Sequence, residues 1–340
     1  MRTLLTIALL LTTTRILAQT ADNTTIRVDS RLVVVPALVR APGKDVAYSL
    51  RTEDFQLTDR GLPQKLSLDD AKNQPLSLVV LMQTGGAAVR EFDKYSGLET
   101  MLADILGGAP NQVAIVNFDS QPEAASPFTS DIAQWADAID HPDPGNSGAA
   151  IRDALKFSMN LLAKRPANHR KVILLISQQQ DSGSTTSTEE IARMAGETDT
   201  AIYSVTFTPQ LTRLKGALKE PGTPATPWPV ADGHYIVSFN LTEPLHMVLD
   251  AMKKDVASEI ATLSGGEALR FSDRNQLDDT LALIGRHIQN RYMLSFSPSK
   301  PTPGFHSIKV SLLNHPELAV TSRTGYWLSS TSDSKSSASH

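Results

Sequence analysis

The stretch LSLVVLMQTGGAA, residues 76–88, decides the fold, because an apolar run of strand length ends in a turn of small residues. Three more apolar runs follow, at Gln112–Phe118, Lys171–Ser177 and Ala201–Phe207. Runs without polar alternation are typical of strands buried on both faces. Between them, apolar residues recur at helical spacing: Phe92, Tyr95, Leu98, Leu102 and Ile105, then Ile151, Leu155, Met159 and Leu162. This alternation predicts a doubly wound, mostly parallel α/β sheet flanked by helices.

The segments on either side of this core have the composition of β-strands. Ile26–Arg40 and the short apolar stretches up to residue 75 come before it, and 291–297, 306–313 and 319–323 come after it. Each flank alone is too short to bury a sheet face. We therefore expect residues 19–75 and 291–328 to pair into one small β-sandwich, with the α/β domain of residues 76–290 inserted between them.

Three further segments complete the predicted organisation. The Pro-, Gly- and Thr-rich stretch at about 209–240 is typical of an insertion loop, and the Ser-rich tail 329–340 is typical of disorder. Helical spacing resumes over Pro244–Leu263 and again at about 276–289, with a short strand near Glu267–Phe271 between them.

The first eighteen residues have the order of features that a secretory signal requires. Arg2 supplies a positive charge, an apolar run from Leu4 to Leu11 follows, and Ala18 offers a small residue for cleavage. The run is too short to span a bilayer. We expect residues 1–18 to be a signal peptide of a protein exported to the periplasm or beyond, with no membrane insertion of the mature chain. A buried N-terminal strand is the alternative interpretation.

Composition and motifs exclude several function classes. The 32 basic and 36 acidic residues give a net charge of −4, which offers no electrostatic footprint for nucleic acid. The chain has no cysteine, and it lacks the His-Glu-x-x-His, Gly-x-Ser-x-Gly and phosphate-loop motifs. These absences argue against the common metalloprotease, serine hydrolase and phosphate-binding classes, and we expect no cofactor.

Several short sequences, taken in order, suggest a known family. They are the turn Gln83-Thr84-Gly85-Gly86-Ala87, the helix start Gly145–Leu155, the strand end Leu174–Asp181, and the flanking Glu53-Asp54-Phe55, Leu263–Gly266 and Arg291–Pro298. In order and spacing this series resembles the von Willebrand factor A domain, and with its flanks the exported von Willebrand factor A-related proteins of acidobacteria. The resemblance spans roughly residues 25–328 and implies an interaction domain.

That family usually carries a metal-ion-dependent adhesion site, and this sequence departs from its pattern at every ligand. The resemblance implies an Asp-x-Ser-x-Ser turn, a Thr in a second loop and an Asp after a later strand. The residues found at those positions are Gln83, Gly85, Ala87, Ala149 and Gln178, with Thr84 inside the turn. Mg²⁺ needs oxygen ligands with carboxylate charge, so we expect no metal at these positions.

These observations predict an exported, non-enzymatic interaction module that acts without metal. A protein partner or a second copy would bind the loops 83–90, 119–128, 141–149 and 178–187. One alternative is a metal-dependent adhesion protein that uses the acids Asp119, Asp143 and Asp181. Another is a hydrolase with an unrecognised site in the insertion.

Overall fold

The computed structural model describes residues 32–42, 46–47, 49–69, 74–107, 110–207 and 245–328, with side chains from 249 onward in the last range. The predicted signal peptide, the insertion loop and the Ser-rich tail lie outside the described residues. None of the helices formed by the described residues is long and apolar enough to cross a membrane.

A mostly parallel sheet forms the centre of the α/β domain, as predicted, and it has six strands. Its strands are β5 (Leu76–Gln83), β6 (Gln112–Phe118), β7 (Pro122–Thr129), β8 (Arg170–Gln178), β9 (Thr200–Phe207) and β10 (Ala268–Phe271). They lie in the order β10-β9-β8-β5-β6-β7, and all neighbours are parallel except the β6–β7 pair. The four apolar runs of the sequence are β5, β6, β8 and β9, the four inner strands.

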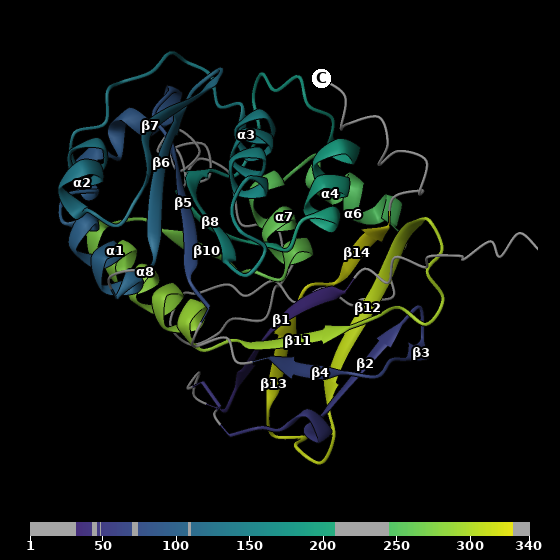
Figure 1. Cartoon of the computed structure of the whole chain (residues 1–340). Coiled ribbons are helices and arrows are strands. Elements are labelled where there is room, and N and C mark those ends of the chain that lie inside the picture. The colour runs from purple at the N-terminus through teal and green to yellow at the C-terminus, as the bar shows by residue number, and fades with distance from the viewer. Residues whose placement is uncertain are drawn as a thin grey trace, which may run out of the picture. The chain divides into compact units, whose positions relative to one another are not determined.

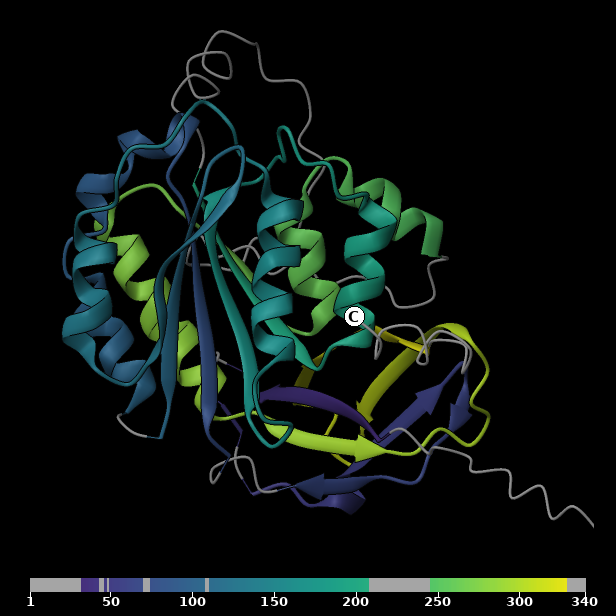
Figure 2. The same ribbon diagram turned by 45° about the horizontal axis from the view of Figure 1, so that its top comes forward.

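Helices cover both faces of this sheet (Figures 1 and 2). The first face packs against α1 (Leu98–Leu106), α2 (Ile132–Asp140) and α8 (Arg274–Gln289), and the second against α3 (Ile151–Ala163), α4 (Thr188–Glu197), α6 (Leu245–Met252) and α7 (Val256–Ser264). Successive residues of β5 alternate between the two cores: Leu78 and Val80 join the first, Val79 and Leu81 the second. A strand buried on both faces therefore has no polar alternation.

The flanking segments form two four-stranded sheets. One contains β1 (Val33–Arg40), β4 (Ser67–Asp69), β11 (Tyr292–Phe296) and β13 (Ala319–Ser322); the other contains β2 (Phe55–Asp59), β3 (Leu62–Pro63), β12 (Gly304–Leu312) and β14 (Gly325–Leu328). Both sheets contribute to one apolar cluster, in which Phe296 meets Tyr326 edge-on at 5.7 Å. This arrangement is compatible with the predicted sandwich.

Two local expectations were wrong. Residues 119–128, expected as a loop, are mostly strand β7, which carries Pro122 and Pro127 at the edge of the sheet, where prolines are tolerated. The helical stretch Pro244–Leu263 is two helices, because the Asp255 side chain accepts a hydrogen bond from the Ser258 backbone and starts α7 afresh.

Candidate functional site

The sheet changes direction of winding between β5 and β8. The strands β6 and β7 lie on one side of β5, and β8, β9 and β10 lie on the other. In open α/β sheets, ligands bind beyond the carboxyl ends of the strands at such a switch point. Gln83 ends β5 and Gln178 ends β8, so two of the residues selected from the sequence lie where this rule places a site.

These two glutamines bind each other. The Gln178 backbone donates to Gln83 Oε1 at 2.9 Å, and Gln83 Nε2 donates to Gln178 Oε1 at 3.3 Å and to the Gly85 carbonyl at 2.9 Å. Gln83 is fully buried. The amide groups satisfy one another without a cation, which two carboxylates at this separation could not do.

Gly85 lies against the loop that precedes α3. A Cβ atom on Gly85 would be 2.4 Å from the Asn146 carbonyl oxygen, 2.6 Å from that of Gly148 and 2.6 Å from Asp119 Cβ. Backbone hydrogen bonds from Gly86 to Asn146 and from Gly145 to Thr84 hold the two loops together. A serine, which the family pattern has at the Gly85 position, therefore has no room here.

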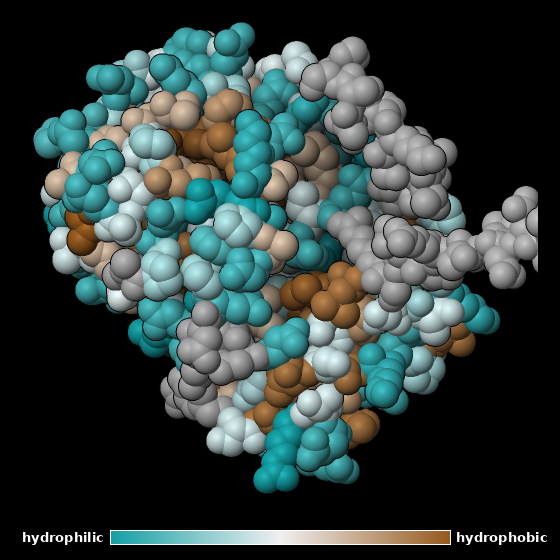
Figure 3. All heavy atoms as spheres, viewed as in Figure 1, coloured by the Kyte–Doolittle hydropathy of each residue, from teal (hydrophilic) through white to brown (hydrophobic). Residues whose placement is uncertain are grey.

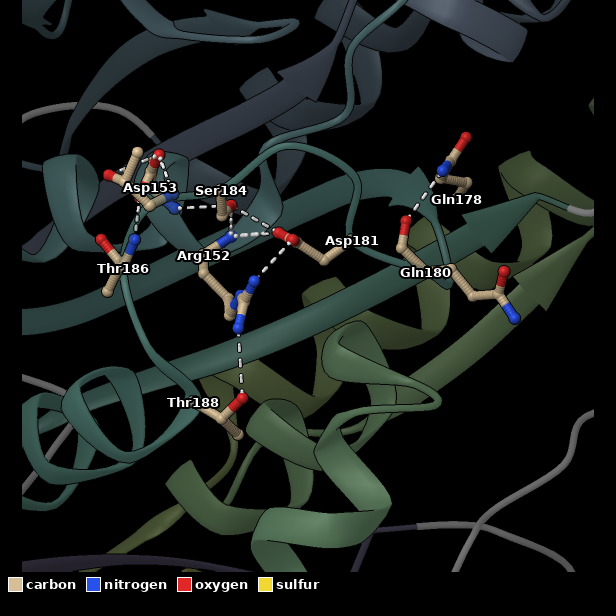
Figure 4. Close-up of polar contacts among 9 residues, drawn as sticks. Arg152, Asp153, Gln178, Gln180, Asp181, Ser184, Thr186 and Thr188 are labelled. Atoms are coloured by element: carbon tan, nitrogen blue, oxygen red, sulfur yellow. Dashed lines mark hydrogen bonds and ion pairs between the residues drawn. The ribbon is translucent and has the colours of Figure 1, made fainter.

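An internal ion pair joins the start of α3 to the loop after β8 (Figure 4). Arg152 Nη2 is 3.0 Å from Asp181 Oδ2, and the Arg152 backbone donates to Asp181 Oδ1 at 3.0 Å. The Ser184 hydroxyl donates to Asp181 Oδ1 at 2.5 Å, and Arg152 Nη1 donates to the Thr188 hydroxyl. A guanidinium of this chain thus supplies the positive charge that Asp181 needs.

The other acids also bind protein groups or face solvent. Burial would raise the pKa of Asp119, but hydrogen bonds from the backbones of Asn146 and Gln121 outweigh burial and hold it below its usual range. Asp143 is exposed. Among the described residues, no group of three His, Asp or Glu side chains could hold a metal ion.

Asp153 lies in the first turn of α3 and binds the neighbouring loop. Its carboxylate accepts hydrogen bonds from the backbones of Thr185 (2.8 Å) and Thr186 (2.7 Å). Burial would raise its pKa, and these hydrogen bonds, with those of the threonine hydroxyls, lower it overall. The residue fastens the loop after β8 to the start of α3.

We call the loops after β5, before α3 and after β8 the rim. The six residues selected from the sequence form the floor of the rim instead of its outer surface. Gln83, Thr84, Gly85 and Ala149 are buried, and Ala87 and Gln178 are half-buried. The outer surface of the same loops consists of exposed neighbours: Gly86, Val89, Arg90, Asn146, Ser147 and Gln180. Val89 is 40% exposed and is one of five exposed large apolar side chains among the described residues.

Sequence reasoning missed two buried histidine–carboxylate pairs. His306 Nδ1 lies 2.9 Å from Asp59 Oδ1, whose other oxygen accepts from the Tyr326 hydroxyl at 2.7 Å. His287 Nδ1 lies 2.7 Å from Glu267 Oε2. Both histidines are 1% exposed, so neither meets a dissolved substrate. The partners are far apart in sequence, and spacing gives no signal for them.

Comparisons with known proteins agree with this fold. The family model of the von Willebrand factor type A domain matches residues 82–180. No curated protein matches the chain.

Solved structures that resemble the chain are remote in sequence. An aerotolerance-related membrane protein from Bacteroides fragilis has 14% identity and a TM-score of 0.41, with 63% of this chain and 98% of that chain covered. Proximal thread matrix protein 1 of the mussel byssus, solved with a zinc-occupied MIDAS motif, has 14% identity and a TM-score of 0.44, with 67% of this chain and 49% of that chain covered. The von Willebrand factor domain of the pilus tip protein Mfa5 from Porphyromonas gingivalis has 23% identity and a TM-score of 0.28, with 32% of this chain and 39% of that chain covered. The strand order and the match of residues 82–180 together show a von Willebrand factor A-like α/β fold.

Proposed function

We propose that this chain is an exported, non-enzymatic interaction module that binds a protein partner, or a second copy of itself, without metal. The binding surface is the outer layer of the loops after β5, before α3 and after β8. The family match at residues 82–180 supports an interaction role, since domains of this type are interaction modules.

The hydrogen-bonded pair of Gln83 and Gln178 is the main support for binding without a metal ion. Both amides are neutral, and they satisfy each other directly at the switch point. Mg²⁺ would have to displace these hydrogen bonds and then bind without a carboxylate at either position.

The exposed residues above this floor suit a protein contact. Val89 offers an apolar anchor next to the cation Arg90, and the loop at Asn146 and Ser147 adds polar groups around it. Protein interfaces combine an apolar centre with a polar rim in this way. The loops are held from beneath by Asp119 and Asp153, so they are preorganised for binding.

Thermal unfolding of the full chain with Mg²⁺, Mn²⁺ or Ca²⁺, and then with EDTA, tests metal independence. A metal that binds only the folded state adds about 2.7 kcal/mol at a hundredfold excess over its dissociation constant, enough to raise the midpoint by several degrees. We expect no shift with any of the three ions. A rise that EDTA reverses would establish the metal-dependent alternative with Asp119, Asp143 and Asp181.

A photoreactive amino acid at Ser147 tests the binding surface, with Lys164 at the far end of α3 as the control position. We expect a discrete protein adduct, or a dimer of this chain, from position 147 in EDTA and none from position 164. Val89→Asp should abolish the adduct, whereas Ile132→Asp, on an equally exposed side chain of α2 (45%), should not. Equal adducts from both positions, or adducts that require a divalent ion, would contradict the proposal.

A further inference from the structure

A cleft of about 210 Å³ lies at the end of the six-stranded sheet opposite to the rim. The starts of β8 and β9 line one side of it, and β1 and β11 line the other. Because β8 begins at Arg170 and ends at Gln178, the cleft and the amide pair lie at opposite ends of the same strand.

One wall of the cleft is apolar. It consists of Val34 and Pro36 of β1, Leu32 just before β1, and Met293 of β11. Leu32 is 52% exposed, the largest exposure among the large apolar side chains of the described residues. Figure 3 shows apolar surface over the region where Figure 1 draws β1 and β11. This wall can cover a hydrocarbon group that enters from solvent.

The opposite wall carries two cations, Arg170 and Lys171. The Arg170 guanidinium is half-buried and donates to the carbonyl oxygens of Ile288 at 2.9 Å and Gln74 at 3.3 Å. In the part of the chain that the structure describes, no carboxylate forms an ion pair with either cation. Burial lowers the pKa of Arg170, which is the direction expected for a charge that lacks a counterion.

The floor of the cleft contains buried polar groups with unused hydrogen-bonding capacity. Arg291 Nε donates to the Tyr203 hydroxyl at 2.6 Å, which leaves the hydroxyl proton free to donate. Burial raises the pKa of Tyr203 to about 12, so it remains protonated at neutral pH. Arg291 Nη2 is buried without a hydrogen bond, although Glu267 Oε2 lies 3.7 Å away.

The acids near the cleft leave its excess of positive charge in place. Glu267 serves the buried Arg291, and also His287 and Arg40. Asp199 lies 3.3 Å from Arg323 and is paired there. Asp69 is exposed at the end of β4 and is one acid against the two cations of the wall. A buried or half-buried excess of cations favours an anion.

We propose that this cleft binds a small organic carboxylate, whose anionic group meets Arg170 and Lys171 and whose hydrocarbon body lies against β1. The site is independent of the rim and of the function proposed for it. The planar guanidinium offers paired N–H donors to a carboxylate, and the Tyr203 hydroxyl offers a third. The apolar wall selects an amphipathic anion over a free inorganic one.

Calorimetric titration of the full chain with hexanoate, hexanamide and inorganic phosphate tests the chemistry of the ligand. We expect binding of hexanoate and at least tenfold weaker binding of the neutral amide, because the amide cannot form a charge-assisted pair. Phosphate should bind at least tenfold more weakly than hexanoate. Equal affinity for amide and carboxylate, stronger binding of phosphate, or no binding of hexanoate would overturn the proposal.

Matched variants locate the site. Arg170→Gln should weaken hexanoate about tenfold or more and Lys171→Gln about threefold, whereas Lys164→Gln, which removes the same charge from an exposed residue outside the cleft, should change the affinity less than twofold. Leu32→Ser should weaken hexanoate while leaving the shorter propionate unchanged.

Because Leu32 and Lys171 contribute little to the core, those two variants keep the test decisive if Arg170→Gln fails to fold. Unchanged hexanoate affinity in both would exclude the cleft as its binding site.

Discussion

The two ends of the central sheet differ in whether their polar and charged side chains have partners within the protein. At the carboxyl end, Gln83 and Gln178 bind each other, Asp181 has its own arginine, and the loops pack without space for an additional Cβ atom at Gly85. At the amino end, Arg170 and Lys171 line a cleft without a carboxylate partner among the described residues. The polar groups at the carboxyl end bind one another, whereas the cations at the amino end can still bind an anion.

This difference reverses the usual expectation for open α/β sheets, in which ligand chemistry gathers at the carboxyl ends of the strands. We propose that this end instead presents a preformed surface to a large partner. The amino end has the cavity and the uncompensated charge that suit a small ligand. Four substitutions test the comparison, and they are ordered by the size of their expected effect.

Gly85→Ala should have the largest effect, because its Cβ would be 2.4 Å from a backbone oxygen and the backbone cannot rotate away. Gly85 has φ −92°, so the cost is steric and not conformational. We expect a loss of about 3 kcal/mol in the free energy of unfolding, measured by urea denaturation. The control Gly183→Ala, at φ +96° in open space, should cost about 1 kcal/mol. A smaller loss at Gly85 than at Gly183 would refute the closed packing of the rim.

Asp181→Ala should follow, because it leaves a partly buried guanidinium without its counterion and removes an acceptor at the start of α3. We expect a loss of about 2 kcal/mol, less than for a fully buried pair because Arg152 remains 22% exposed. Lys253→Ala breaks the exposed Lys253–Asp250 pair and should cost less than about 0.5 kcal/mol. Equal losses in the two variants would show that the rim pair is no more than a surface contact.

Asp119→Asn should change how stability depends on pH. The folded pKa of Asp119 is lowered, so its stabilising contribution is present above the unfolded value of about 3.9 and is lost as the pH falls through the folded pKa. The variant should therefore be less stable at neutral pH and lose less stability on acidification. Asp143→Asn, an exposed acid in the neighbouring loop, is the control for net charge. Parallel pH curves for wild type and Asp119→Asn would contradict this role.

Lys171→Gln should give the smallest effect, at the cleft end of the sheet. Burial lowers the pKa of His169, and the positive charges of Arg165 and Lys171 lower it further. Removing the Lys171 charge should raise the His169 pKa toward its ordinary value, as followed by NMR titration of the ring protons, while Lys164→Gln should leave it nearer to wild type. An unchanged His169 pKa in Lys171→Gln would mean that solvent screens the cations of the cleft.

The sequence predicted the inner strands well because burial on both faces gives them continuous apolar runs. Gln112–Phe118 was predicted with its observed bounds, and β5, β8 and β9 within one residue. Strand β7 could not be predicted in this way: four of its eight residues are exposed, and it contains two prolines. Helix α2 was also missed, since it buries only Trp135 and Ile139 deeply. Helix α4 was missed because its buried residues, apart from Ile191, are small or polar. A continuous apolar pattern marks an element that is buried on both faces, and an element at the edge of the sheet is less buried.

For the site, the order of the motifs predicted the positions of Gln83 and Gln178, but not their mutual hydrogen bonds. The contact between Gly85 and the loop at Asn146 depends on backbone placement, for which side-chain identity gives no signal. The cleft joins Leu32, Arg170 and Met293, which are more than 100 residues apart from one another in the chain. Only the fold brings them together.

The packing around Gly85 also has an evolutionary consequence. A serine cannot replace Gly85 without moving its neighbours. A serine at position 85 requires the loop at Asn146 and Gly148 to move first, and that loop is held by Asp119. Carboxylates introduced at 83 and 178 before the loop has moved would face each other without a cation. Steps toward the family's metal-site pattern therefore conflict with the packing at position 85 and, once both carboxylates are present at 83 and 178, with their mutual repulsion.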